Sequence, residues 1–104
     1  MALLENKSNY VVTENNGDIE LYSYKSLVVT WHDSKSGSCG FDGVLKFGVD
    51  YNFSRTTKKH IRMFLNKYTL FGNMDIEKSI DRGFVYGNGI YKQNIAVLYD
   101  ETMK

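Results

Sequence analysis

The sequence predicts an α+β fold in which an antiparallel β-sheet packs against one main amphipathic helix at about residues 57–68. Three observations predict this class: an Asn-Gly pair between two β-rich runs, an alternating segment at residues 44–53, and a change to helical spacing directly after it. The 104 residues are 42% hydrophobic and 24% charged, which fits one compact globular domain over residues 1–104.

The first two elements are β-rich runs on either side of an Asn-Gly pair at residues 16–17. Both residues of a two-residue type I′ turn need positive φ, which Asn and Gly adopt at low cost. This loop places Val12 opposite Leu21 and Glu14 opposite Ile19, so that one apolar set shares a face. The segment therefore predicts a β-hairpin with a defined register.

A third strand and a long loop follow the hairpin. Residues 26–32 are rich in Val and contain the single Trp, which is typical of a strand. Residues 33–43 are rich in Gly and Ser and predict a loop, either a plain connection or a segment that carries contacts. Residues 44–53 alternate between apolar side chains and Lys, Gly, Asp or Asn, which predicts a strand with one buried face.

Helical spacing begins directly after this strand. Apolar residues recur at i, i+3, i+4 and i+7, which defines one face of an amphipathic helix. A side-chain oxygen of Ser54, Thr56 or Thr57 can cap its N-terminus, and Gly72 is the expected stop. Burial of each apolar side chain contributes roughly 1.5–3 kcal/mol, so packing stabilises this helix more than its cap does. The four side chains are Ile61, Phe64, Leu65 and Tyr68.

The C-terminal third predicts shorter elements. Residues 74–83 carry two isoleucines four positions apart, with Asn73 or Asp75 as cap, which indicates a short second helix. A Gly-Asn-Gly turn at residues 87–89 separates two apparent strands, and residues 94–101 predict a last strand. Strands joined by tight turns favour an antiparallel meander, and we expect the long helix to cover its apolar face.

Positive charge gathers on the predicted helix, although the whole chain has a net charge of only +1. Arg55, Lys58, Lys59 and Arg62 lie away from the apolar stripe, and residues 55–74 contain no acid. Cations near a helix N-terminus oppose the macrodipole, so helix stability does not explain them. They indicate either a partner-binding surface or the solvated face of an amphipathic helix.

Two tyrosines join these cations as candidate contact residues. If Ile19 and Leu21 face the core, Tyr22 and Tyr24 face outward together from the same strand. Exposed aromatic side chains are enriched at protein interfaces and also stack on nucleic-acid bases. The competing interpretation places both rings in a second small apolar layer under the C-terminal strands.

No catalytic residue, metal site or cofactor is expected. His32, Cys39 and His60 lack the spacing of zinc ligands, and we expect His60 to flank the core and bond a backbone carbonyl. The Gly-Asn-Gly turn lacks a phosphate-loop pattern, and no set of acid, base and nucleophile stands out. A lone cysteine, no apolar run long enough to span a membrane and no signal peptide predict a cytoplasmic protein.

Two segments, YSYKSL at residues 22–27 and FSRTTKKH at residues 53–60, carry a resemblance. They resemble small phage-encoded proteins of unassigned function. Those proteins have a tyrosine-rich Y-S-Y strand, and then a strand that ends in Tyr or Phe followed by S-x-T-T-x-K-H and an amphipathic helix. The resemblance covers residues 22–65 at most. The matching residues are Tyr22, Ser23, Tyr24, Ser26, Leu27, Phe53, Ser54, Thr56, Thr57, Lys59 and His60.

The resemblance implies an accessory protein made during infection, acting as a non-enzymatic interaction module. By analogy with counter-defence inhibitors such as anti-CRISPR proteins, the partner would be a host protein, for example a defence nuclease. The alternative function is nucleic-acid binding, in which the helix cations contact phosphates. From charge and exposure, the contact residues would be Arg55, Lys58, Lys59, Arg62, Tyr22 and Tyr24.

Overall fold

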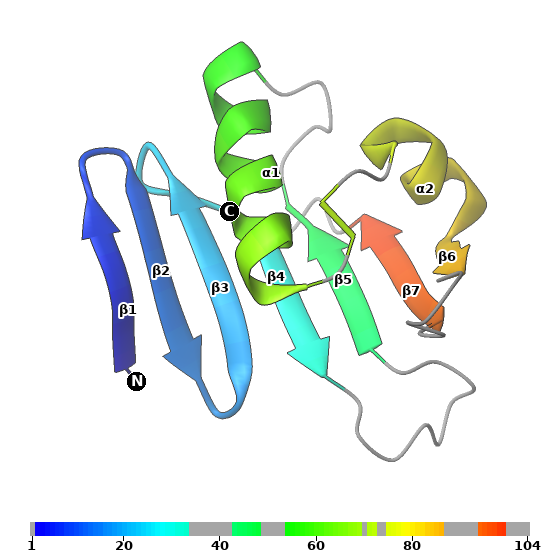
Figure 1. The fold of residues 1–104 in the computed structure, drawn as a ribbon, viewed down its shortest axis with the longest axis horizontal. Helices are drawn as coiled ribbons and strands as arrows, with labels where there is room; N and C mark the ends of the chain where they lie inside the picture. The colour runs from blue at the N-terminus through cyan, green and yellow to red at the C-terminus, as the bar shows by residue number, and fades with distance from the viewer. Residues whose placement is uncertain are drawn as a thin grey trace.

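The computed structural model confirms the α+β fold, and the residues that it describes form one sheet and two helices (Figure 1). It describes residues 2–33, 43–48, 54–69, 71–72, 75–86 and 94–99. Within them the helices are α1 (Arg55–Tyr68) and α2 (Ile76–Arg82). The strands are β1 (Ala2–Lys7), β2 (Tyr10–Asn15), β3 (Asp18–Ser23), β4 (Ser26–Asp33), β5 (Gly43–Phe47), β6 (Phe84–Tyr86) and β7 (Asn94–Tyr99).

The described strands form one sheet in the order β1-β2-β3-β4-β5-β7-β6. Neighbouring strands are antiparallel except for β5 and β7, which run parallel. The predicted antiparallel sheet is therefore confirmed for the other strand pairs, and the parallel β5–β7 pair is the exception. The chain passes through α1 and α2 to β6 at the sheet edge, and β7 then pairs with β6 on one side and β5 on the other. β7 therefore runs opposite to β6 and in the same direction as β5.

β2 and β3 form the predicted hairpin, and its predicted register is confirmed. Val12 pairs with Leu21 and Glu14 pairs with Ile19. The Asn-Gly turn at residues 16–17 has φ values of 55° and 88°, the left-handed region that this turn requires. Val12 and Leu21 are both fully buried, so the shared apolar face is the face that packs on the core.

The edge strand β1 has no clear signal in the sequence. Its run ALLENK neither alternates strictly nor contains a β-branched residue. It pairs with β2 in a register that shifts between Leu3 and Glu5, and the side chains of Leu3 and Leu4 are exposed. Pairing with β2, rather than local preference, therefore determines this strand.

α1 starts two residues before the predicted position and ends at Tyr68, as predicted. The Ser54 hydroxyl accepts a hydrogen bond from the Thr57 backbone N–H at 3.2 Å, so the helix starts directly after Ser54. The helix ends where Thr69 donates to the Leu65 carbonyl, from its backbone N–H at 3.0 Å and from its hydroxyl at 2.6 Å. Gly72 lies beyond this cap, so the prediction that it stops the helix is wrong.

α2 confirms the short second helix. The Asp75 carboxylate accepts a hydrogen bond from the Lys78 backbone N–H at 3.1 Å, which caps the N-terminus. Gly83 ends the helix with φ of 82°, a conformation that glycine adopts without steric cost. Asp75 was one of the two predicted caps, whereas the stop at Gly83 was not part of the prediction, although it too is a local signal.

The remaining predicted strands are described in part. β5 covers the first residues of the alternating segment, with Leu45 and Phe47 buried and Lys46 exposed, as expected. β7 covers the start of the last predicted strand, with Ile95 and Val97 buried. The predictions for residues 34–42, which include Cys39, and for residues 49–53 and 87–93 lie outside the described residues.

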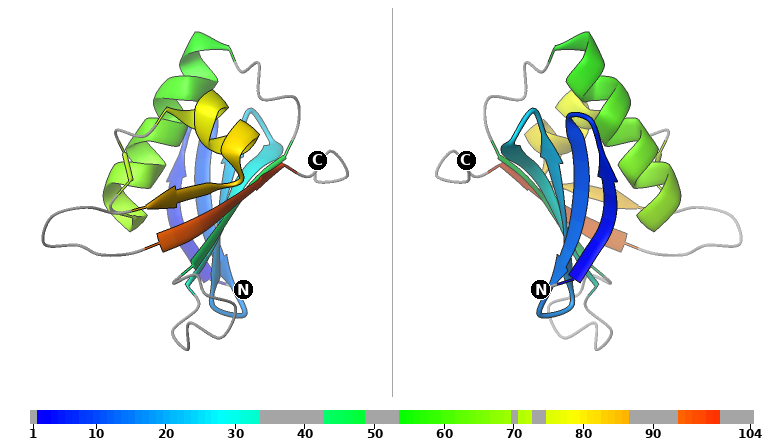
Figure 2. Two further views of the ribbon diagram at one scale, coloured as in Figure 1. Left: turned by 90° about the vertical axis from the view of Figure 1, so that its right-hand side faces the viewer. Right: turned by 90° about the vertical axis from the view of Figure 1, so that its left-hand side faces the viewer.

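Both helices cover the same face of the sheet, as Figure 2 shows. The apolar side chains between the sheet and the helices form the core, and the predicted apolar face of α1 contributes to it. The opposite face, which we call the helix-free face, is covered by neither α1 nor α2. The largest fully buried side chains are Phe47, Phe64, Leu21, Leu45, Ile61, Leu65, Ile95, Val12, Val29 and Val97.

Candidate functional site

The predicted basic residues of α1 divide into two pairs, and the first pair has partners within the fold. Lys58 approaches Glu77 of α2, with 3.8 Å between Nζ and Oε1. Arg62 donates from Nη1 to the Gly72 carbonyl at 3.3 Å. An exposed ion pair such as Lys58–Glu77 contributes only about 0–1 kcal/mol, so these contacts orient the side chains more than they stabilise the protein.

Arg55 and Lys59 form the second pair, and both side chains are exposed. Neither makes an ion pair or a hydrogen bond with any residue that the structure describes. The first turn of α1 contains no acidic residue, so the helix supplies no local counter-charge. The start of α1 is therefore an open electropositive surface.

Tyr22 and Tyr24 do not share a face, so that prediction is wrong. Tyr22 lies in β3 on the helix-free face, where burial raises the pKa of its hydroxyl. β3 ends at Ser23, and Tyr24 lies in the turn to β4 with φ of 52° and 49% of its surface exposed. Its ring centroid is 5.9 Å from that of His60, so Tyr24 lies on the helix side of the sheet, against α1.

His60 ties α1 to the end of β3. Its Nδ1 is 2.9 Å from Ser23 Oγ, and the same oxygen is 3.3 Å from Thr57 Oγ1. Its ring also meets the edge of Tyr10 at a centroid distance of 5.3 Å. The prediction that His60 flanks the core is confirmed, but its partner is a hydroxyl group rather than a backbone carbonyl.

The Ser23–His60 pair is a structural contact. Ser23 is only 2% exposed, so its hydroxyl is closed to a substrate. Burial, and secondly the charge of Lys59, lowers the pKa of His60, which favours the neutral form of the ring. A neutral ring can share one proton with the Ser23 hydroxyl and pack against aromatic rings without a desolvation penalty for charge.

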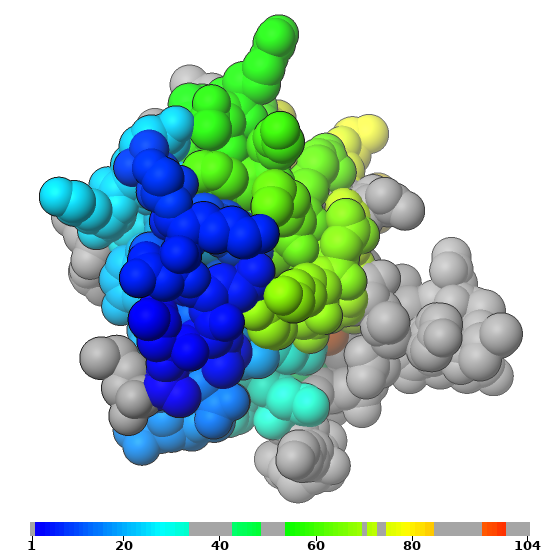
Figure 3. All heavy atoms as spheres, turned by 60° about the vertical axis from the view of Figure 1, so that its left-hand side comes forward, coloured from blue at the N-terminus to red at the C-terminus, as the bar shows by residue number. Residues whose placement is uncertain are grey.

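Glu5 is the centre of a polar cluster between β1 and the C-terminal half of α1. Figure 3 shows these two elements side by side. The Tyr68 hydroxyl donates to Oε2 at 2.7 Å, and Lys67 and Lys7 lie 3.2 Å and 3.9 Å from Oε1. The Tyr68 hydrogen bond, with help from Lys67, lowers the pKa of Glu5 against the opposing effect of burial. Burial, and then Glu5, raises the pKa of Tyr68 and takes that of Tyr10 to about 12.

This cluster was missed because its acid lies in β1, a strand without a sequence signal. The basic partner, Lys67, was visible in the sequence as part of the charged helix, but its contact with Glu5 joins positions far apart in the chain. No local pattern predicts such a pair. Both Glu5 and Lys67 serve packing of α1 on the edge of the sheet.

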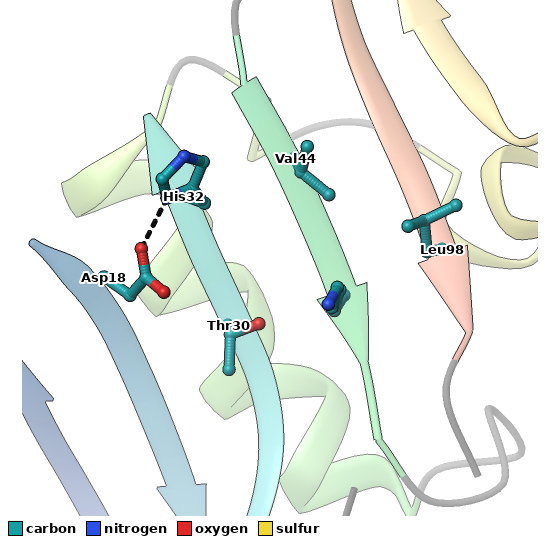
Figure 4. Close-up of a pocket in the computed structure, with 6 residues that line it drawn as sticks. Asp18, Thr30, His32, Val44 and Leu98 are labelled. Carbon is teal, nitrogen blue, oxygen red and sulfur yellow. Dashed lines mark hydrogen bonds and ion pairs between the residues drawn. The ribbon is translucent and has the colours of Figure 1, made fainter. Parts of the chain in front are cut away.

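A hollow of about 360 Å³ lies on the helix-free face (Figure 4). At one end Asp18 Oδ1 bonds His32 Nδ1. At the centre Lys46 makes no ion pair or hydrogen bond with a residue of the described part of the chain. The lining residues are Asp18, Thr30, His32, Val44, Lys46 and Leu98.

The two histidines lie on opposite sides of the sheet, since His60 belongs to α1 and His32 lines the hollow. Among the described residues, no three His, Cys, Asp or Glu side chains lie close enough together to hold a metal ion. None of the described helices is long and apolar enough to cross a membrane.

Comparison with known proteins identifies a family. The model of a family of unknown function, DUF8033, matches residues 2–82. The matched segment runs from β1 through α2 and stops before β6 and β7. No curated protein and no solved structure matches the chain. The function therefore has to be inferred from the surfaces described above.

Proposed function

The chain belongs to DUF8033, a family of unknown function, and we propose that it is a non-enzymatic interaction module that binds an acidic protein partner. The proposed contact residues are Tyr24, Lys25, Arg55 and Lys59, which we call the turn–helix surface. They come from the turn between β3 and β4 and from the first half of α1. The ring contact between Tyr24 and His60 holds the turn against the helix.

The observation that carries this proposal is the backbone of the Tyr24–Lys25 turn. The two residues have φ of 52° and 68°, the left-handed region, which costs a non-glycine residue about 1–2 kcal/mol. The hairpin between β2 and β3 places Asn-Gly in the same region at residues 16–17, where the cost is small. With 49% of its surface exposed, Tyr24 recovers only part of this cost by burial. Strain retained at exposed side chains favours a binding role.

The charge of the surface indicates the chemistry of the partner. Lys25, Arg55 and Lys59 make no ion pair with any described residue. An acidic patch on a partner would offset these charges and accelerate association more than it would increase affinity. Tyr24 would supply the aromatic contact, since tyrosine is enriched among the residues that dominate binding energy at protein interfaces.

The burial of the Ser23–His60 pair supports the non-enzymatic part of the proposal. Ser23 and His60 have the residue types of a nucleophile and a base, but Ser23 is 2% exposed and also contacts Thr57. A nucleophile must reach its substrate, so this pair does not favour acyl or phosphoryl transfer.

Nucleic-acid binding is the less well supported alternative. Lys58 and Arg62 have partners within the chain, which leaves Arg55 and Lys59 as the open cations of the predicted helix set. With four phosphate contacts, log K would fall against log salt with a slope of about −3.6, and with two the slope would be about −1.8. A surface of this kind would give weak and salt-sensitive binding.

The partner proposal extends to the host cell. The resemblance of residues 22–65 to small phage-encoded proteins supports a cytoplasmic host protein, for example a defence nuclease, as the partner. This extension rests on the resemblance and is independent of the turn geometry. It makes bacterial host extract the appropriate source of partner.

The test is affinity capture from bacterial host lysate with immobilised protein, read by quantitative mass spectrometry. Arg55→Glu/Lys59→Glu should reduce retention of a specific partner at least tenfold, and Tyr24→Asn should reduce it as well. The matched control is Lys78→Glu/Arg82→Glu, which makes the same change of charge on exposed residues of α2. It should retain the partner.

Three outcomes contradict the proposal. Equal loss with the α2 control would show that net charge, rather than the turn–helix surface, determines retention. Full retention by the Arg55→Glu/Lys59→Glu variant would exclude this surface. Salt-sensitive retention of DNA or RNA, lost in the same variant, would favour the nucleic-acid alternative.

A further inference from the structure

We propose that the hollow on the helix-free face binds a small organic acid that carries one anionic group on an apolar body. This site lies on the opposite side of the sheet from α1 and does not depend on the function proposed for the turn–helix surface. Its volume of about 360 Å³ is at the lower end of the range for pockets that hold small ligands.

Cross-strand pairing brings the lining side chains together. Thr30 pairs with Lys46 and Lys46 pairs with Leu98, so these three residues form one row across β4, β5 and β7. His32 pairs with Val44 in the adjacent row. Directly opposed residues have Cβ atoms about 4.5–5.5 Å apart, so one small molecule can reach the whole row. Figure 4 shows the side chains of Thr30, Val44 and Leu98 in front of the sheet, with the helices behind it.

Lys46 gives the hollow its preference for an anion. The Asp18 carboxylate is already bonded to His32 Nδ1. The ammonium group of Lys46 has no such partner among the described residues, so it is the charge in the lining that a ligand can offset. The Thr30 hydroxyl, in the same row, can donate a second hydrogen bond to the same anionic group.

Two acids on this face favour a ligand with a single negative charge. Asp18 lines the hollow, and Glu20 pairs with Thr30 on the side away from Lys46. Glu20 is two strand spacings from Lys46, roughly 10 Å. A nucleic-acid backbone would bring several phosphates against these carboxylates, whereas one carboxylate seated at Lys46 stays clear of Glu20.

The apolar part of the ligand has a complementary surface. Leu98 is 44% exposed and Val44 is half-buried, and both line the hollow. Lys46 is two residues from Val44 along β5 and pairs with Leu98 of β7, so its methylene groups adjoin both side chains and add apolar area. An aliphatic or aromatic body covering this strip removes it from water, which is the main source of affinity for a small ligand.

The test is an NMR titration of the full nitrogen-15-labelled chain with hexanoate, hexan-1-ol and hexylammonium. We expect hexanoate to bind with a Kd in the millimolar range, because so small a ligand makes few contacts. Hexan-1-ol should bind about two- to fivefold more weakly, which corresponds to the contribution of one exposed ion pair. Hexylammonium should bind more weakly still. The shifted amides should include those of Thr30, Val44, Lys46 and Leu98.

Two substitutions separate the anionic and apolar contacts. Lys46→Met keeps the length of the side chain and should reduce the affinity for hexanoate to that for hexan-1-ol. Leu98→Asn should weaken the binding of hexanoate and hexan-1-ol by the same factor, because it removes apolar area without changing charge. The matched control Lys78→Met removes an exposed lysine from α2 and should change neither affinity.

The proposal is overturned if hexanoate and hexylammonium bind the wild-type protein equally well. It is also overturned if Lys46→Met, with an NMR spectrum that shows it to be folded, binds hexanoate as the wild type does. The proposal is overturned as well if the amides of Thr30, Val44, Lys46 and Leu98 do not shift at about 50 mM hexanoate, which is well above the expected Kd.

Discussion

Replacing Tyr68 by Phe removes one hydroxyl group from the contact between β1 and α1 and leaves the ring in place. That hydroxyl donates to Glu5 Oε2 at 2.7 Å. A hydrogen bond to a charged group contributes about 1.5–3 kcal/mol to stability. The Glu5 side chain is 12% exposed, so water replaces part of the lost bond, and we expect Tyr68→Phe to cost about 1–2 kcal/mol.

Thermal unfolding followed by circular dichroism measures this cost. For a domain of this size, a loss of about 1–2 kcal/mol lowers Tm by roughly 5–10 °C. The control is Tyr24→Phe, which removes the same atom from a half-exposed ring whose hydroxyl bonds no residue of the described chain. We expect that variant to unfold at the wild-type temperature.

The pH dependence of the Tm difference between Tyr68→Phe and wild type shows whether Glu5 is the acid involved. The folded-state pKa of Glu5 is lowered below the unfolded value of 4.5, with the Tyr68 hydrogen bond as the largest cause. The stabilisation is therefore fully present above pH 4.5 and is lost as the pH falls through the folded-state pKa. Equal Tm values for Tyr68→Phe and wild type at pH 7, or a difference that grows on acidification, would refute this reasoning.

Three further measurements test other parts of the structure. The pKa of His60 should lie below 6.5, because burial and then Lys59 disfavour the charged form of the ring. The free energy of unfolding should therefore fall as the pH drops from 6.5 toward the folded-state pKa. An NMR titration of the ring that gave a pKa above 6.5 would contradict this. Gly43→Ala should cost about 1–3 kcal/mol in urea unfolding, because its Cβ would overlap the Trp31 ring. Gly17→Ala should cost about 1–2 kcal/mol through its φ of 88° alone, since no atom lies within 4 Å of the added Cβ; an unchanged urea midpoint would argue against this turn.

The elements that the sequence predicted well each have a local physical cause. The hairpin between β2 and β3 has a turn that only Asn-Gly and similar pairs adopt easily, and a one-residue slip would expose Val12 and Leu21. α2 has a side-chain cap at Asp75 and a glycine stop at Gly83. Such signals act within a few residues, so they can be recognised without knowledge of the rest of the fold.

The features that the sequence did not predict depend on contacts between distant segments. β1 acquires its conformation by pairing with β2, and β7 pairs with two strands from distant parts of the chain, in parallel with β5 and antiparallel with β6. The basic helix face was predicted as one set, but Lys58 meets Glu77 of α2 and Arg62 meets the Gly72 carbonyl. Neither partner is implied by the spacing of the cations along the helix.

The error over Tyr24 has a different cause, and it bears on function. Residues 24–25 have the left-handed backbone of a hairpin turn but not the residues that normally occupy it, so the sequence pattern placed Tyr24 in the strand. A position where a local rule fails is expected to be strained or functional.

Replacing the residues of this turn by those of the other hairpin distinguishes strain without a function from strain that serves binding. Tyr24→Asn/Lys25→Gly copies the pair at residues 16–17 into a backbone of the same hand. It relieves about 1–2 kcal/mol at each residue and gives up the half-exposed ring contact with His60, so we expect a net gain of about 1 kcal/mol in urea unfolding. Partner retention should fall in the same variant. Higher stability with full retention would mean that the strain serves no binding role, and lower stability would mean that the Tyr24 ring is needed for the fold itself.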